Sequence, residues 1–143
     1  MPAFAKNLIV FLTGGVIYSL IEILFRGFTH WTMTLTGGLC LLILFTVFSE
    51  KKMSLPAKCL FGAFVITSLE FAVGCLVNII LGWDVWDYSH CPYNLWGQIC
   101  LPFSAAWFLI TIPVDFLCRG LNRAFGDTGN SYVLPAAERN SLL

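Results

Sequence analysis

Charged residues are scarce in this sequence. Only 11% of the 143 residues are Asp, Glu, Lys or Arg, whereas 58% are hydrophobic. An ordinary soluble domain has roughly 25% charged residues. The eight basic and eight acidic residues cancel, so the net charge indicates no particular partner. The length predicts a single domain, and the composition argues against an ordinary soluble one.

The sequence also lacks the short motifs that mark common enzymes and nucleotide-binding proteins. It contains no glycine-rich loop of the kind that binds nucleotide phosphates, so any ATP that drives this protein must be bound by a separate subunit. None of the six cysteines forms a CxxC pair. Ser89, His90 and Cys91 are neighbours in the sequence, whereas catalytic partners normally come from separate elements. We therefore expect no enzymatic activity, no cofactor and no metal site.

Long apolar runs are what the sequence has instead. The length of each run is close to that of a helix that crosses a bilayer, which is about 20 residues. Each run is apolar at both odd and even positions, whereas a membrane-spanning strand alternates between apolar and polar residues. Because hydrocarbon offers the backbone no hydrogen-bond partner, the runs are predicted to be helices. The fold class is an all-α integral membrane bundle of four transmembrane helices. The spans are residues 4–25, 31–48, 57–81 and 97–118, within a domain of residues 1–118 that is followed by a flexible cytoplasmic tail at 119–143.

Basic residues lie almost entirely on one side of the predicted bundle. With four spans, the N-terminus, the connection between the second and third spans and the C-terminal tail share one side. They carry Lys6, Lys51, Lys52, Lys58, Arg119, Arg123 and Arg139, and only Arg26 falls on the other side. Because short basic loops remain in the cytoplasm, both termini are predicted to be cytoplasmic in a multi-pass protein of the cell membrane.

Two glutamates fall inside the predicted spans. Glu70 lies about 20 Å along the third helix at 1.5 Å per residue, which is near the bilayer midplane. Glu22 lies near the outer end of the first span, four residues before Arg26. Charges inside a membrane are expensive and therefore indicate function. Two structural interpretations stay open: an ion pair between Glu22 and Arg26, and a Glu70 whose hydrogen bonds only lock the bundle.

Small and polar residues accompany both glutamates at helical spacing. The third span carries the stripe Gly62, Ile66, Glu70, Gly74 and Asn78, and the first carries Gly14, Tyr18, Glu22 and Arg26. Small residues let helices approach closely, so both stripes are predicted to face the protein interior. The segments "VIYSLIE" at 16–22 and "VITSLE" at 65–70 are similar, which indicates two helical hairpins in parallel repeat. The candidate transport residues are Tyr18, Glu22, Glu70 and Asn78.

The fourth span combines prolines with an acidic residue. Pro102 and Pro113 lie eleven residues apart and should loosen or kink the helix. Asp115 lies near the cytoplasmic end, four residues before Arg119. We expect an ion pair between these two side chains.

The outer loop concentrates polar and aromatic residues in the stretch "WDYSHCPYN" at 86–94. Tryptophan and tyrosine are enriched at membrane–water interfaces, so the stretch can be an interfacial cap that closes the outer mouth of the bundle. The longer segment "WDYSHCPYNLWGQICLPFSAAWF" at 86–108, with "GVIYSLIE" at 15–22 and "LEFAVG" at 69–74, resembles the ABC-transporter type IV family of bacterial permease-like membrane proteins, which is common in Firmicutes. The resemblance covers roughly residues 14–107 and leaves the tail after Cys118 outside.

This resemblance implies a membrane-domain subunit of a transporter. It also favours a structured outer cluster, pinned by a pair between Asp87 and His90, that serves as a gate or recognition site. The cluster comprises Trp86, Asp87, Tyr88, Ser89, His90, Asn94 and Gln98. The expected partners are the lipid bilayer and either further copies of the chain or a partner membrane or ATPase subunit, with no nucleic acid. A structural or regulatory membrane protein and a small proton-coupled exporter remain the alternatives.

Overall fold

The structure, a computed structural model, describes residues 1–126. Its elements are α1 (Ala3–Arg26), α2 (Trp31–Glu50), α3 (Leu55–Gly74), the π-helix η1 (Cys75–Ile80), β1 (Asn94–Leu95), β2 (Ile99–Cys100) and α4 (Leu101–Ala124). Four helical segments are long and apolar enough to cross a membrane: α1, α2, α3 continued by η1, and α4. The predicted all-α bundle of four transmembrane helices is confirmed.

The fourth helix lies further along the chain than the predicted span. Residues 97–100 belong to a short antiparallel hairpin, in which Leu95 pairs with Ile99, because Gly97 has a positive φ of 69° and cannot start a helix. Pro102 then occupies the first turn of α4, where its missing N–H is not needed. Of the two prolines predicted to kink the helix, only Pro113 therefore lies in its interior.

The end of α4 also changes the predicted domain boundary. The helix continues to Ala124, so the boundary placed at residue 118 falls inside α4 and residues 119–124 are helical. The remainder of the predicted tail, from residue 127, lies outside the described residues. Arg119 and Arg123 therefore belong to the last turns of α4 and not to the tail.

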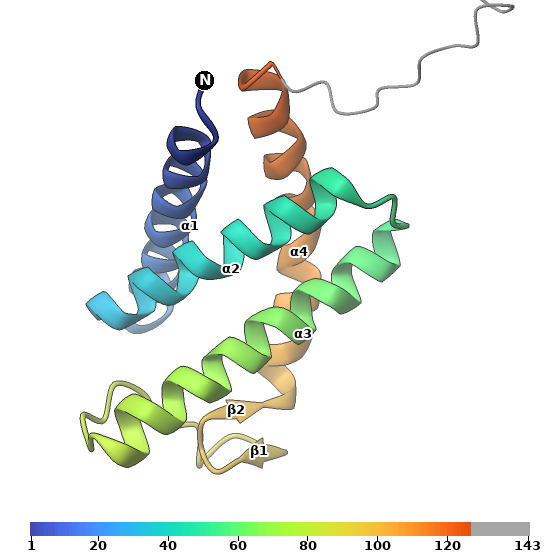
Figure 1. Cartoon of the computed structure of the whole chain (residues 1–143). Helices are drawn as coiled ribbons and strands as arrows, with labels where there is room; N and C mark the ends of the chain where they lie inside the picture. Colours follow the sequence, from blue (N-terminus) through green and yellow to red (C-terminus); the bar gives the residue numbers. More distant parts are fainter. Residues whose placement is uncertain (127–143) are drawn as a thin grey trace, which may run out of the picture.

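The helices pack as two hairpins. The closest helix pairs are α1 with α2 and α3 with α4, and α2 then packs against both α3 and α4. Figure 1 shows the N-terminus and the end of α4 at the top of the molecule, and the α1–α2 connection and the β-hairpin toward the bottom left. The prediction of two helical hairpins agrees with this packing.

Glycines permit the close approach within each hairpin. A Cβ atom added at Gly37 of α2 would lie 2.2 Å from the Cβ of Tyr18 on α1, and one added at Gly62 of α3 would lie 2.2 Å from Oγ1 of Thr111 on α4. Real Cβ contacts are never this short, so no larger residue fits without a shift of the helices. The predicted interior positions of Gly14 and Gly62 are confirmed, since both are buried against the neighbouring helix.

Side-chain contacts join the helices at both ends of the bundle. At the end that holds the α1–α2 connection and the loop after η1, Arg26 Nη1 donates to the carbonyl of Val85 at 2.6 Å, and the rings of Trp31 and Trp83 lie 6.0 Å apart. At the opposite end, Lys58 Nζ lies 2.6 Å from Asp115 Oδ1. Asp115 also binds Arg119, which confirms the predicted pair. Lys58, on α3, is a second partner of Asp115 that was not predicted.

Candidate functional site

Glu70 lies at the centre of the bundle, where its carboxylate meets side chains from two other helices. It is 2% exposed. The hydroxyl of Tyr18 on α1 donates to Oε1, and the indole Nε1 of Trp107 on α4 donates to Oε2 at 3.1 Å. Each carboxylate oxygen therefore has its own donor, as a buried acidic group requires.

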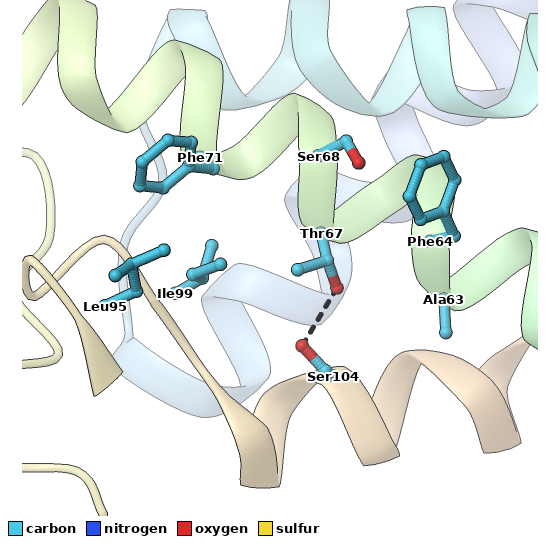
Figure 2. Close-up of a pocket in the computed structure, with 8 residues that line it drawn as sticks. All are labelled: Ala63, Phe64, Thr67, Ser68, Phe71, Leu95, Ile99 and Ser104. Atoms are coloured by element: carbon cyan, nitrogen blue, oxygen red, sulfur yellow. Dashed lines mark hydrogen bonds between the residues drawn. The ribbon is translucent and has the colours of Figure 1, made fainter. Parts of the chain in front are cut away.

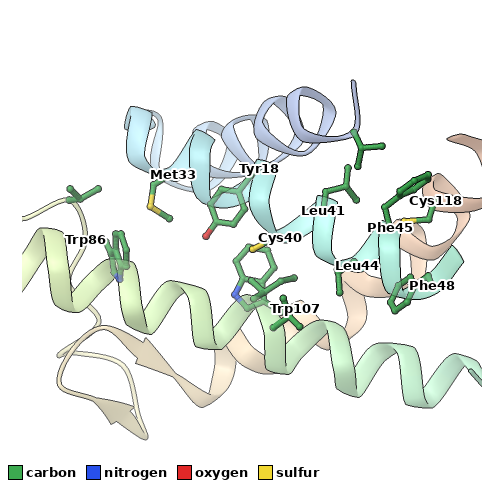
Figure 3. Close-up of a cluster of buried hydrophobic side chains, with 14 of the residues drawn as sticks. Tyr18, Met33, Cys40, Leu41, Leu44, Phe45, Phe48, Trp86, Trp107 and Cys118 are labelled. Carbon is green, nitrogen blue, oxygen red and sulfur yellow. The ribbon is translucent and has the colours of Figure 1, made fainter. Parts of the chain in front are cut away.

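The two donors are held in place by each other and by α2. The rings of Tyr18 and Trp107 are stacked, with centroids 5.4 Å apart and an angle of 25° between the planes. Figure 3 shows both rings among the buried side chains between the helices, with Cys40 beside them. Because Gly37 has no side chain, Tyr18 can lie directly against the backbone of α2. Glu70 thus connects α1, α3 and α4, while α2 provides the space for Tyr18.

A small apolar cavity borders the two aromatic donors. Its volume is about 50 Å³. All four helices contribute to its lining, which includes Gly14, Tyr18, Leu44, Ile66 and Trp107. A water molecule occupies about 30 Å³ of liquid, whereas a small-molecule site usually has roughly 300–1,000 Å³. In this conformation the cavity is too small for an organic solute.

Glu22 lies apart from Glu70, at the end of α1. Its Oε2 is 2.6 Å from Arg26 Nη2, one helical turn along the same helix. Arg26 in turn donates to the backbone of Val85 in the outer loop. The structure therefore forms the ion pair that the i, i+4 spacing indicates, and it brings Tyr18 but not Glu22 into hydrogen-bonding contact with Glu70.

Asn78 belongs to a separate group of hydrogen bonds, which we call the outer latch and define as Asn78, Trp86 and Gln98. Asn78 Nδ2 donates to Gln98 Oε1 at 2.8 Å, and Asn78 Oδ1 accepts from the backbone N–H of Val85 at 2.7 Å. The indole of Trp86 donates to the carbonyl of Gln98 at 2.9 Å. The latch fastens the outer loop onto η1.

Trp86 and Gln98 of the outer latch pack against α3 at Gly74, one helical turn after Glu70. A Cβ added at Gly74 would lie 2.7 Å from Gln98 Oε1 and 2.8 Å from Cζ2 of Trp86. Only a glycine lets these two side chains pack so closely on α3. The stripe predicted from Glu70, Gly74 and Asn78 therefore continues from the central carboxylate to the latch, as an interior-facing surface.

The polar tip of the outer loop is organised by Asp87 and Asn94. Asp87 Oδ1 accepts from the backbone N–H of Ser89 at 2.9 Å and from its hydroxyl. These hydrogen bonds hold the pKa of Asp87 below its ordinary value. Asn94 Nδ2 donates to the carbonyls of Ser89 and Cys91 at 3.3 Å and 3.0 Å. The tip is a set of local turns.

The expected direct pair between Asp87 and His90 is wrong for this structure. Within residues 1–126, the hydrogen-bond partner of the Asp87 carboxylate is Ser89, and His90 is exposed. The turn directs the aspartate toward the residue two positions on, as Asx turns commonly do. His90 contributes only the weakest of the interactions that lower the pKa of Asp87.

Tyr88 links the loop to the start of α4. Its ring is stacked on Phe103 with centroids 4.7 Å apart, and its backbone N–H donates to the carbonyl of Gly97 at 2.7 Å. Burial raises the pKa of the Tyr88 hydroxyl above its ordinary value. Of the predicted cluster, Trp86, Tyr88 and Gln98 therefore face protein, whereas Asp87, Ser89, His90 and Asn94 are exposed.

Trp107 and Lys58 are the partners that sequence reasoning missed. Trp107 supplies one of the two donors to Glu70, and Lys58 supplies the cross-helix partner of Asp115. A tryptophan inside an apolar helix resembles any other core residue, so the sequence did not indicate that Trp107 donates to Glu70. The lysine had one: it lies four residues into α3, where an unpaired charge would be expensive.

An apolar groove lies on the outside of the bundle between α3, α4 and the β-hairpin. Its volume is about 440 Å³, and its lining includes Phe64, Phe71, Leu95 and Ile99. Figure 2 shows the hydrogen bond between the hydroxyls of Thr67 and Ser104, 2.9 Å apart, which joins the two helices that form the groove. The groove lies on the surface of α3 and α4 and shares no lining residue with the cavity beside Tyr18 and Trp107.

The fold and this interior define the class of protein. Four apolar helices of membrane-spanning length enclose a buried acidic group, so the chain is a multi-pass integral membrane protein. It belongs to the family described as "Putative ABC-transporter type IV", whose model matches residues 9–130. The match extends beyond the expected range of residues 14–107 and continues past Cys118 through the end of α4 to residue 130.

The other comparisons add no further assignment. No curated protein and no solved structure matches the chain. Among the described residues 1–126, no group of three or more His, Cys, Asp or Glu side chains is placed to hold a metal ion. Family membership therefore places the chain among membrane transport proteins, while its substrate and mechanism must be argued from the residues.

Proposed function

We propose that this chain is the permease subunit of a transporter, in which Glu70 is the working acidic group and the outer latch closes the outer end of the interior. The observation that carries the proposal is the position of Glu70, an acidic side chain buried inside a membrane-spanning helix and bound by donors from two other helices. Buried ionisable groups of this kind usually mark ion or substrate pathways. Membership of an ABC-transporter family supports the same reading.

The proposal includes a partner, because one chain encloses too little space for a solute. The interior cavity of about 50 Å³ is far smaller than a typical small-molecule site. A pathway for an organic solute would form between this chain and a second copy, or between this chain and another membrane subunit. An ATP-binding subunit would supply the energy on the cytoplasmic side.

The proposed orientation places both termini in the cytoplasm and the outer latch outside the cell membrane. It is supported by the basic residues Lys51, Lys52 and Lys58, and by Arg119 and Arg123, which lie at one end of the bundle. In a Cys91→Ser background, a cysteine at position 89 should react with an impermeant maleimide on intact cells. A cysteine at position 54 should react only after permeabilisation, and its labelling on intact cells would contradict the orientation.

A structural role is the competing function for Glu70, because both of its oxygens already have donors. The variant Glu70→Gln distinguishes a structural Glu70 from one that works by ionising. The amide oxygen of glutamine can accept from Trp107, and its NH₂ can donate to the Tyr18 hydroxyl, which accepts as readily as it donates. The variant should therefore fold and keep its partners, but it cannot ionise.

The test is to purify the complete tagged chain from its native membranes, identify the co-purifying subunits, and measure ATP hydrolysis by the complex against pH. We expect an ATP-binding subunit with both wild type and Glu70→Gln, and a loss or altered pH dependence of hydrolysis in the variant alone. Recovery of this chain without any ATP-binding subunit would overturn the permease proposal. A variant as stable and as active as wild type at every pH would leave Glu70 a structural residue.

A further inference from the structure

Two cysteines lie together at the base of the outer hairpin. Cys91 precedes the hairpin, and Cys100 ends its second strand, where the register pairs Cys100 with Asn94. Asn94 Nδ2 donates to the carbonyl of Cys91 at 3.0 Å, which bends the chain back so that Cys91 comes close to the second strand. Both thiols are free in this structure.

The segment between the two cysteines contains strained backbone. Tyr93 and Trp96 both have a φ of 54°, in the left-handed region that residues with a side chain rarely adopt. Such conformations persist only where the surroundings hold them. The same segment carries Gln98, which binds Asn78 and accepts from Trp86. Anything that constrains residues 91–100 therefore also constrains the outer latch.

We propose that Cys91 and Cys100 form a disulfide bond on the outer face of the membrane, which locks the hairpin and holds Gln98 in the outer latch. The inference rests on the outward orientation given under Proposed function. An oxidising exterior permits stable disulfides, whereas the cytoplasm does not. The other four cysteines lie in the membrane-spanning segments, at positions 40, 59, 75 and 118.

The reaction requires an oxidant, for which the chemical class is an exported thiol oxidase with a reactive disulfide. The thiolate of Cys91 attacks one sulfur of that disulfide, forms a mixed disulfide and releases the other oxidase sulfur as a thiolate. Cys100 then loses its proton and attacks the Cys91 sulfur, which releases the second oxidase thiolate. Two protons and two electrons leave the cysteine pair, and the oxidase disulfide becomes a dithiol.

The burial of the two thiols sets this order. Cys91 is partly exposed, so an oxidase can reach it. Cys100 is only 3% exposed, and burial raises the pKa of its thiol above the ordinary value. Cys100 is therefore the slower thiolate. It lies opposite Asn94, whose side chain binds the carbonyl of Cys91, so it is placed to resolve the mixed disulfide.

The test uses the full chain in its native membranes, where free thiols are trapped with N-ethylmaleimide before extraction. Peptide mass spectrometry should find Cys91 linked to Cys100, lighter by two hydrogens than the free pair, and Cys75 alkylated or buried but unlinked. A permeant reductant should lower the Tm of the detergent-solubilised wild type by a few degrees. Cys91→Ser should have the lower Tm from the start and should not respond to the reductant, while Cys75→Ser should respond as wild type does.

Recovery of Cys91 and Cys100 as separately alkylated thiols would overturn the proposal. An impermeant maleimide, applied to intact cells, then separates the two possible failures. If it labels Cys91, the loop faces outward and only the disulfide fails. If it labels Cys91 only after permeabilisation, the orientation has failed as well.

Discussion

Glu22 and Glu70 end similar segments of sequence, yet they bind different parts of the molecule. Glu22 pairs with Arg26 on its own helix, whereas Glu70 accepts hydrogen bonds from Tyr18 on α1 and Trp107 on α4. The first contact follows from helical spacing alone. The second exists only when three helices are packed. The comparison shows that two copies of a motif can be used differently, one at a helix end and one at the centre of the bundle.

The same contrast recurs in other polar groups of the chain. Asp87 bonds to Ser89 two residues on, as locally as Glu22 bonds to Arg26. Asp115 combines both kinds of contact, because it binds Arg119 on its own helix and Lys58 on α3. If the distinction is physical, variants of the tertiary contacts should affect stability more than variants of the local ones.

The largest difference is expected between Glu70→Ala and Glu22→Ala. Removing Glu70 leaves two buried donors without an acceptor and opens a gap between helices, so it should lower the free energy of unfolding by about 3 kcal/mol or more. Glu22→Ala removes a single ion pair, and Arg26 keeps its hydrogen bond to Val85, so the loss should be smaller, about 1.5 kcal/mol. Reversible unfolding in detergent micelles measures both. If both variants lost the same free energy of unfolding, the tertiary contacts of Glu70 would not be stronger than the local contact of Glu22.

The next difference concerns glycines with and without a neighbour. Gly37→Ala would place a Cβ 2.2 Å from that of Tyr18, and overpacking of this kind costs about 1–3 kcal/mol. Gly120 of α4 has nothing within 4 Å of the same position, so Gly120→Ala should be neutral or stabilise the helix by up to about 1 kcal/mol. Of the two alanine variants, only Gly37→Ala should therefore lower the Tm. A destabilised Gly120→Ala would show that this end of α4 has a partner.

A smaller loss is expected from Trp107→Phe. Phenylalanine keeps the ring beside Tyr18 but removes the donor to Glu70 Oε2, and interhelical hydrogen bonds in membranes contribute about 1 kcal/mol. Trp31→Phe is the control, because Trp31 is 59% exposed and its indole donates to no buried group among the described residues. A Trp107→Phe protein as stable as wild type would mean that the second oxygen of Glu70 needs no donor.

The smallest effect is expected in the outer loop, from Ser89→Ala. Hydrogen bonds from Ser89 lower the pKa of Asp87, so this aspartate stabilises the folded loop above the ordinary aspartate pKa of about 3.9. That contribution is lost as the pH falls through the lowered pKa of the folded state. In Ser89→Ala, the pKa of Asp87 should rise toward its ordinary value, as measured by carbon-detected NMR titration. His90→Ala should leave it nearly unchanged, and a larger shift in that variant would restore the predicted Asp87–His90 pair.

Several elements of the site could be predicted because they depend on spacing along one helix. The pairs Glu22–Arg26 and Asp115–Arg119 required only the i, i+4 rule. The burial of Glu70 required only its depth in an apolar run and the absence of partners in lipid. Gly14 and Gly62 were placed on interior faces for the same reason. In each case the surrounding sequence already contained the physical cause.

Other elements could not be predicted, because they depend on how helices cross and loops turn. Trp107 becomes a donor to Glu70 only when α4 is rotated to face α3. His90 is excluded from Asp87 by a turn that directs the carboxylate to Ser89. The fourth span begins at Leu101 instead of residue 97 because the hairpin uses the intervening residues, and an apolar run carries no sign of that competition.

By itself, the sequence determined that this protein resides in a membrane, that it crosses as four helices, and that Glu22, Glu70 and the glycines that share their helical stripes face inward. These properties follow from the cost of exposing charge and backbone to hydrocarbon, which is the same wherever the helix stands. Only the tertiary structure decided which groups bind Glu70, how Asn78, Trp86 and Gln98 form the outer latch, and which cysteines meet. Hydrogen bonds and thiol contacts act over a few ångströms, so they are selected by the packing of elements that are distant in the sequence.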